Sequence, residues 1–279
     1  MDAIAKVIED EFAIDQAKSV DKRSALDPDR FGYLSLHYVV ALSTTRAGLA
    51  EYADLAGLKA EIQIRSILQH SWAEIEHDLG YKTQREIPSS IRRDFSRLAG
   101  LLELADAEFM RIRSRISDYT EEVSKQIITT PQNVTLDLVS LRQFVDQESL
   151  VAELDEGIAE RLGFTLMKDR GPRVDGEVER LAYFQVVTVA QLGEQLHAHA
   201  KDILALAGAF ASSDEDDADR TLSRGVSLFY LCYILAAKTE SHSFIREYLD
   251  DFSIAEIRQS NTTIEEQLLE FWRQRNKGS

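Results

Sequence analysis

The alternation of apolar and polar positions separates the first third of the chain from the rest. Residues 36–42 are rich in β-branched and aromatic side chains, and residues 58–65 alternate cleanly between apolar and polar, as a half-buried strand does. A further strand is expected within residues 12–20. Short helices are expected at residues 2–11, 46–56 and 66–79. This succession predicts helices packed around a small sheet.

From residue 91 onward the apolar positions follow the period of a helix. Helices are expected at residues 91–128, 147–162, 188–211, 217–239, 241–251 and 262–275. Residues 168–177 are the best linker candidate, and the aromatic run Leu228–Tyr233 is expected to be buried core. We therefore predict an α+β fold in two parts. Residues 1–130 hold a small mixed β-sheet flanked by helices, and residues 131–279 form a mostly helical region with a regulatory or oligomerising role.

Composition narrows the classes of function. The 279 residues contain 32 Lys and Arg and 48 Asp and Glu, a net charge of −16, which repels nucleic acid at long range. Cys232 is the only cysteine, so an internal disulfide and a cysteine-based zinc site are excluded. No apolar run approaches the roughly 18 residues of a membrane span, and the first residues do not read as a signal peptide. We expect a cytoplasmic protein without a membrane partner.

The strand at residues 58–65 has two faces of different chemistry. Its apolar side chains point one way, and Lys59, Glu61, Gln63 and Arg65 point the other. One interpretation is an ordinary amphipathic strand with a solvated face. The other is a phosphate site, in which Glu61 binds a magnesium ion while Lys59 and Arg65 bind phosphate oxygens.

The helix after this strand has a second polar face, formed by His70, Glu74, His77 and Asp78 at spacings of three and four. The order of these residues is not H-E-x-x-H, so zinc hydrolase chemistry is disfavoured. Upstream, Gly32 permits close backbone approach. Tyr33 beside it is either a core tyrosine or a flat surface for stacking on a purine.

Taken together, these segments resemble a known family. The run GYLSLHYVV, followed by EIQIRSILQHSWAEIEHDLGYK, resembles the synthetase domain of the RelA/SpoT family of alarmone synthetases. The family pattern is G-Y-x-S-x-H, then E-[IV]-Q-I-R, then a helix and a Y-K pair. The resemblance implies a nucleotidyltransferase-like synthetase fold. It also implies an enzyme, a GTP pyrophosphokinase that moves pyrophosphate from ATP to the 3′ hydroxyl of GDP or GTP to make (p)ppGpp, with Mg2+.

The resemblance also implies roles for single residues. Tyr33 would stack on guanine, and Glu61 would be the catalytic residue, binding magnesium and helping to activate the attacking hydroxyl. Gln63, Arg65 and His77 would line the acceptor nucleotide, with Lys82 nearby. His37, from the first motif, and Lys59 complete the expected substrate-binding set.

Two features of the family pattern are not matched. The family often reads K-P-N-G-Y where this chain reads Asp29-Arg30-Phe31-Gly32-Tyr33. A basic ATP-binding stretch and a D-x-x-G-x-R strand, which supplies another magnesium ligand, precede the matching segment in the family. We therefore expect a domain incomplete at its N-terminus. The chain would be a truncated product of a synthetase gene, a degenerate member of the family, or a domain that another chain completes.

Three functions follow from these expectations. The first is pyrophosphate transfer to GDP or GTP. The second is a non-catalytic module that binds guanine nucleotides or a partner. The third is a toxin-type relative that pyrophosphorylates transfer RNA, which the acidic charge disfavours. Assembly into a homo-oligomer is a further expectation.

Overall fold

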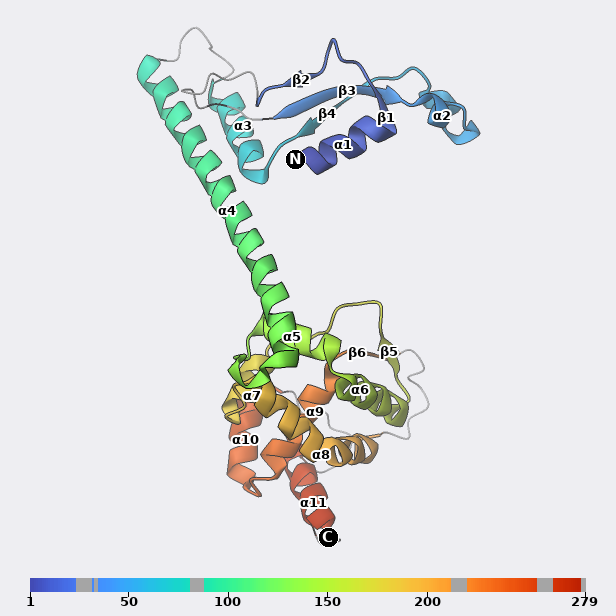
Figure 1. Ribbon diagram of the computed structural model, residues 1–279, viewed down its shortest axis with the longest axis vertical. Helices are drawn as coiled ribbons and strands as arrows, with labels where there is room; N and C mark the ends of the chain where they lie inside the picture. Colours follow the sequence, from blue (N-terminus) through green and yellow to red (C-terminus); the bar gives the residue numbers. More distant parts are fainter. Residues whose placement is uncertain (24–31, 33–34, 81–87, 212–219, 255–262, 277–279) are drawn as a thin grey trace. The chain divides into compact units, whose positions relative to one another are not determined.

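The computed structural model describes residues 1–23, 32, 35–80, 88–211, 220–254 and 263–276 (Figure 1). The chain divides into two compact units, Met1–Arg115 and Ile116–Ser279. The division falls within the longest helix, α4 (Ser89–Thr129). The first unit contains a small sheet with helices and the second is mostly helical, which confirms the predicted α+β class. The predicted domain boundary at residues 130 and 131 lies just after α4 and stays a prediction.

The first unit is built from short elements followed by the first part of α4. In chain order they are α1 (Asp2–Glu11), β1 (Phe12–Ile14), β2 (Val20–Asp21), β3 (Leu36–Leu42), α2 (Thr44–Ala47), the 3-10 helix η1 (Ala50–Leu55), β4 (Ala60–Ile64) and α3 (Ile67–Gly80). The single strand expected within residues 12–20 is two strands joined by a turn. In that turn the amides of Lys18 and Ser19 both donate to the carbonyl oxygen of Asp15. The helix expected at residues 46–56 is split in the same way into α2 and η1.

Strand β3 is the centre of the first unit's sheet. It pairs with β4 along one edge, where Leu36 lies opposite Ile64 and Val40 opposite Ala60. Val40 also lies opposite Ile14 of β1, so β1 occupies the other edge of β3, together with β2. These described pairings are all antiparallel, whereas a mixed sheet was predicted. The connection from β3 to β4 contains α2 and η1 and returns the chain in the opposite direction beside β3.

Helix α1 packs against one face of this sheet (Figure 1). Its buried residues Ala5 and Ile8 contact a cluster of sheet side chains, formed by Leu36, Tyr38, Val40 and Ile64. The hydroxyl of Tyr38 also donates to the carboxylate of Glu9 on α1. Since strand side chains alternate between faces, the residues between these positions must point to the opposite face.

Among its described residues, the second unit contains the end of α4 and ten further elements. They are η3 (Pro131–Asn133), α5 (Leu138–Gln147), α6 (Ser149–Leu162), β5 (Thr165–Met167), α7 (Glu177–Tyr183), α8 (Val189–Ala209), β6 (Thr221–Ser223), α9 (Val226–Ala237), α10 (His242–Asp251) and α11 (Ile264–Asn276). Strands β5 and β6 form a parallel pair that the sequence pattern did not predict. The helix predicted at 217–239 was therefore wrong at residues 221–225, because β6 precedes α9, and residues 217–219 lie outside the described residues.

Helix α9 is the centre of the second unit's core. Leu228, Leu231, Cys232 and Ile234 are completely buried, and Tyr233 is nearly so, which confirms that the aromatic run is core. A helix that is apolar on all sides must be enclosed by other elements, and α9 packs against α6, α7, α8, α10 and α11. None of the helices in the described part of the chain combines the length and apolar character of a membrane span.

The N-terminus of α9 is capped from another helix. The buried carboxylate of Asp155 on α6 accepts hydrogen bonds from the amides of Gly225, at 2.6 Å, and Ser227, at 2.8 Å. Burial raises the pKa of Asp155, and the two amide hydrogen bonds oppose that rise. The carboxylate thus satisfies amides that a helix N-terminus otherwise leaves without an acceptor.

We predict that Asp155→Ala lowers the free energy of unfolding by about 2 kcal/mol, because two buried amides lose their acceptor. Urea unfolding followed by far-ultraviolet circular dichroism measures the change. Asp175→Ala is the matched control. Asp175 pairs with Arg142 at 3.2 Å on the surface, and such pairs contribute little. Equal losses in the two variants would contradict the role of Asp155.

Candidate active site

The sheet face opposite α1 is called the open face here, and it carries Asp15, His37, Lys59, Glu61 and Gln63. In the antiparallel pair β3–β4, His37 lies opposite Gln63, and Val39 lies opposite Glu61. Opposed residues of such a pair project to the same side of the sheet. Asp15 joins this side because its amide donates to the carbonyl oxygen of Val39, at 2.8 Å. The predicted alternation is confirmed at the end of β4, where Ile64 is buried while Glu61 and Gln63 are exposed. Leu58 and Ala60, which were expected on the buried face, are exposed.

Glu61 and His37 form the central contact of the open face. The Nδ1 atom of His37 lies 2.6 Å from Oε1 of Glu61. This hydrogen bond, together with one from Gln63 and the charge of Lys22, lowers the pKa of Glu61. The carboxylate is therefore ionised at neutral pH, and its side chain remains 49% exposed. It is available to a metal ion or to a hydroxyl proton.

Lys59 forms the second charged pair of the open face. Its Nζ atom lies 2.6 Å from the carboxylate of Asp15, whose pKa the hydrogen bond from Lys59 lowers. The position of Asp15 on this face was not predicted from the sequence. Its position depends on the pairing of β1 with β3, and no motif around Asp15 signals that pairing.

Arg65 continues the polar side of β4 toward helix α3. One guanidinium nitrogen of Arg65 lies 3.3 Å from the carboxylate of Glu74, and Nδ1 of His70 lies 3.6 Å from the same carboxylate. His77 follows three residues after Glu74, on the same side of α3, and is exposed. The predicted polar face of this helix therefore meets the polar side of the strand at Glu74, a contact that sequence reasoning missed.

Two predicted site residues, Tyr33 and Lys82, lie outside the described residues. The structure thus brings together Glu61, His37 and Gln63 in one cluster, and it places Lys59 and Arg65 on the same side of β4. The proposed roles of all these residues stay predictions.

The described residues contain no metal site built from protein side chains alone. Within the described ranges, no group of three or more His, Cys, Asp or Glu side chains lies close enough to hold an ion. Magnesium in phosphoryl-transfer sites needs fewer protein ligands, since one or two carboxylates together with substrate phosphates and water complete its coordination shell. The ionised and half-exposed carboxylate of Glu61 fits that requirement.

Comparisons with known proteins concern mainly the first unit. Residues 1–86 match the family described as a region found in RelA / SpoT proteins. GTP pyrophosphokinase YwaC of Bacillus subtilis (strain 168) is 29% identical over 89 residues, covering 32% of this chain and 40% of the relative. GTP pyrophosphokinase YjbM of the same strain is 30% identical over 130 residues, covering 45% and 58%. The matched part of the chain thus spans from two fifths to just under three fifths of the length of these relatives.

Two solved structures also match part of the chain. A GTP pyrophosphokinase family protein from Streptococcus pneumoniae is 28% identical, with a TM-score of 0.33, over 43% of this chain and 57% of its own. The protein smu.1046c from Streptococcus mutans UA159 is 26% identical, with a TM-score of 0.32, over 43% of this chain and 58% of its own.

We predict that His37→Ala raises the pKa of Glu61 toward that of an ordinary glutamate, because the largest cause of its lowering is lost. Carboxyl-carbon NMR titration of the intact protein measures this shift. His70→Ala is the matched control, since His70 contacts Glu74 instead and should leave Glu61 unchanged. An unchanged pKa in His37→Ala would show that the contact is not formed in solution.

Proposed function

We propose that this chain, whose residues 1–86 match the region found in RelA / SpoT proteins, binds a guanine nucleotide on the open face and acts as a GTP pyrophosphokinase. Pyrophosphate would pass from ATP to the 3′ hydroxyl of GDP or GTP. The observation that carries the proposal is the ionised carboxylate of Glu61. His37 holds it on an exposed sheet face that also bears Lys59, and Arg65 follows at the end of the strand.

The reaction requires one bond to form and one to break. The 3′ oxygen of the acceptor attacks the β-phosphorus of ATP. The bond from that phosphorus to the oxygen bridging to the α-phosphate breaks, and AMP leaves with the electron pair. The proton of the 3′ hydroxyl must go to a base near the attacking oxygen. Glu61 is suited to this role, because its hydrogen bond to His37 orients the carboxylate and keeps it ionised.

Magnesium would be held by the same carboxylate together with the donor phosphates. Its charge would neutralise the oxygens between which pyrophosphate moves. His37 would keep one carboxylate oxygen fixed through Nδ1. The other oxygen would face the ion or the hydroxyl.

Each cation of this site is paired with a carboxylate, and a phosphate can take the place of that carboxylate. Arg65 contacts Glu74 at 3.3 Å, and the side chain of Glu74 is 65% exposed. The pair of Lys59 and Asp15 is closer, but the lysine is 51% exposed. The other member of each pair is mostly buried, since the side chains of Arg65 and Asp15 are 18% and 22% exposed. A nucleotide phosphate, with more charge and more acceptor oxygens, can therefore compete for both cations.

The remaining roles follow from the family resemblance and are part of the same proposal. Tyr33 would stack on the guanine base, and Gln63 and His77 would contact the acceptor nucleotide, with Lys82 nearby. These residues would supply positioning, which lowers the barrier by fixing the attacking oxygen in line with the phosphorus. A cytoplasmic location and a homo-oligomeric state remain predictions.

We predict that Glu61→Gln lowers product formation by a factor of about 10²–10⁴, the usual contribution of a general base. The assay combines the whole chain with labelled ATP, magnesium and either GDP or GTP, and separates the products by thin-layer chromatography. Glu51→Gln is the matched control, because it removes the same charge from an exposed position on η1. Equal activity in the two variants would contradict the role of Glu61.

A second measurement separates catalysis from binding. We predict that the chain binds GTP in equilibrium dialysis and that Tyr33→Ala weakens this binding about tenfold, which corresponds to the ~1–3 kcal/mol of a stacked base. GTP binding without product would favour the non-catalytic module. Labelling of transfer RNA in place of GDP or GTP would favour the toxin-type reaction.

A further inference from the structure

Helix α4 carries an unbroken apolar repeat with the spacing of a coiled coil. Apolar side chains recur along it at alternating intervals of four and three residues, which is the spacing of the a and d positions of a heptad. These positions, called the seam, are Ile91, Phe95, Leu98, Leu102, Ala105, Phe109, Ile112, Ile116, Tyr119 and Val123. A strict repeat that continues for more than about 25 residues is typical of a helix that pairs with another helix.

The two ends of the seam are covered by neighbours from the same chain, and its middle is not. The ring centre of Phe95 lies 6.5 Å from that of Trp72 on α3. Val123 is buried in the core of the second unit. Between these ends, Phe109 and Ile112 are 63% and 50% exposed. An exposed apolar stripe of this kind indicates a surface that another element covers.

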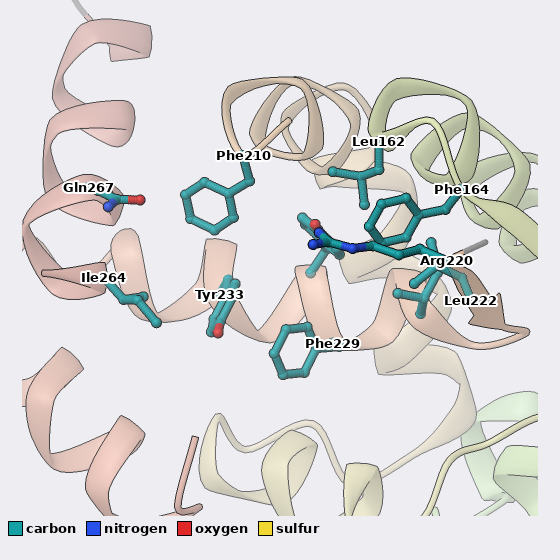
Figure 2. A pocket seen from close by; sticks show the side chains of 11 residues that line it. Leu162, Phe164, Phe210, Arg220, Leu222, Phe229, Tyr233, Ile264 and Gln267 are labelled. Carbon is teal, nitrogen blue, oxygen red and sulfur yellow. The ribbon is translucent and has the colours of Figure 1, made fainter. Parts of the chain in front are cut away.

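Other aromatic residues show how this chain covers its large apolar side chains. In the second unit, Phe210, Phe229 and Tyr233 are arranged around a small cavity (Figure 2). Tyr233 lies 4.5 Å from Phe229 and 6.1 Å from Phe210, measured between ring centres. Among the Phe, Tyr and Trp residues that the structure describes, Phe109 and Tyr119 alone are exposed, and both lie on the seam.

The order of side chains along the seam favours two copies of α4 that run in opposite directions. In an antiparallel pair, the a positions of one helix pack against the d positions of the other. When Phe109 lies beside the partner's Ile112, the same register places Ala105 beside the partner's Ile116. The smallest residue of the seam then faces a large one. A parallel pair would instead set Phe109 against Phe109 and Ala105 against Ala105, which crowds one layer and leaves a void in another.

Charged residues beside the seam fit the same register. Glu108 and Arg115 both occupy g positions, and in an antiparallel pair the g positions face one another. Glu108 then lies opposite the partner's Arg115, and two-fold symmetry repeats this ion pair. In the single chain Glu108 contacts Arg111 of its own helix at 2.8 Å, and the side chains of Glu108 and Arg111 are 46% and 66% exposed. Because so exposed a pair is weak, the partner's Arg115 can compete for the same carboxylate.

We propose that two copies of this chain associate through the middle of α4 as an antiparallel coiled coil, centred between Phe109 and Ile112. The second copy is the occupant of the exposed seam, because the seam is complementary to itself in both shape and charge. A contact of this isologous kind closes after two copies. The proposal concerns α4 and does not depend on the nucleotide chemistry of the open face.

Sedimentation equilibrium of the whole chain, without nucleotide, tests the association. We expect twice the mass of one chain. Ile112→Asp buries a charge in the seam and should weaken the association about a hundredfold, which returns the mass toward that of one chain. Leu104→Asp is the matched control, because Leu104 is 58% exposed on the same helix but lies outside the seam. This variant should keep the double mass.

A charge exchange tests the direction of pairing. Glu108→Arg sets arginines against one another and should weaken the association about tenfold, and adding Arg115→Glu to the same chain should restore it. In a parallel pair Glu108 would face Arg113, so restoration by Arg113→Glu and not by Arg115→Glu would overturn the antiparallel register. A single-chain mass for the unmodified protein, or equal effects of Ile112→Asp and Leu104→Asp, would overturn the association itself. Circular dichroism confirms that each variant keeps its helix content.

Discussion

The register between β3 and β4 is the constraint on which the candidate active site depends. Leu36, Tyr38 and Val40 of β3 must face α1, because their side chains form the core of the first unit. In that register His37 lies opposite Gln63, and Glu61 lies one pair further along the same face. A slip of one residue would turn Glu61 toward the core and an apolar side chain toward solvent. The small core therefore fixes the geometry of the charged cluster.

The open face carries cations on a chain that is acidic overall. The net charge of −16 opposes anion binding at long range, so attraction has to be local. In the proposed function that local attraction comes from Lys59 and Arg65. Lys59 pairs with the carboxylate of Asp15 and Arg65 with that of Glu74, and in each pair one of the two side chains is at least half exposed. Such pairs hold the cations in position while leaving them exchangeable. Glu61 differs, because its partner His37 stabilises the ionised form without occupying both carboxylate oxygens.

The second unit depends on a different interaction, the cap that Asp155 places on α9. The cap joins α6 to the N-terminus of the most buried helix, just after β6. It thereby also fixes the strand pair whose ends carry Phe164 and Arg220. The aromatic residues of α9 are part of the core of this unit. The second unit thus has a hydrophobic core of its own.

The sequence alone determined the elements with strong periodicity. The alternation of β4, the polar face of α3 and the long helices are local properties, set by which residues must be buried. The motif spacing also pointed to the RelA/SpoT region, as the match of residues 1–86 bears out. Only the tertiary structure decided which side chains meet. Asp15 reaches Lys59 through the pairing of β1 with β3, and Glu74 meets Arg65 across two elements. The pairing of β5 with β6 joins segments more than fifty residues apart, and each strand is too short for its period to be detected. Contacts of this kind depend on packing between distant segments, which no local pattern records.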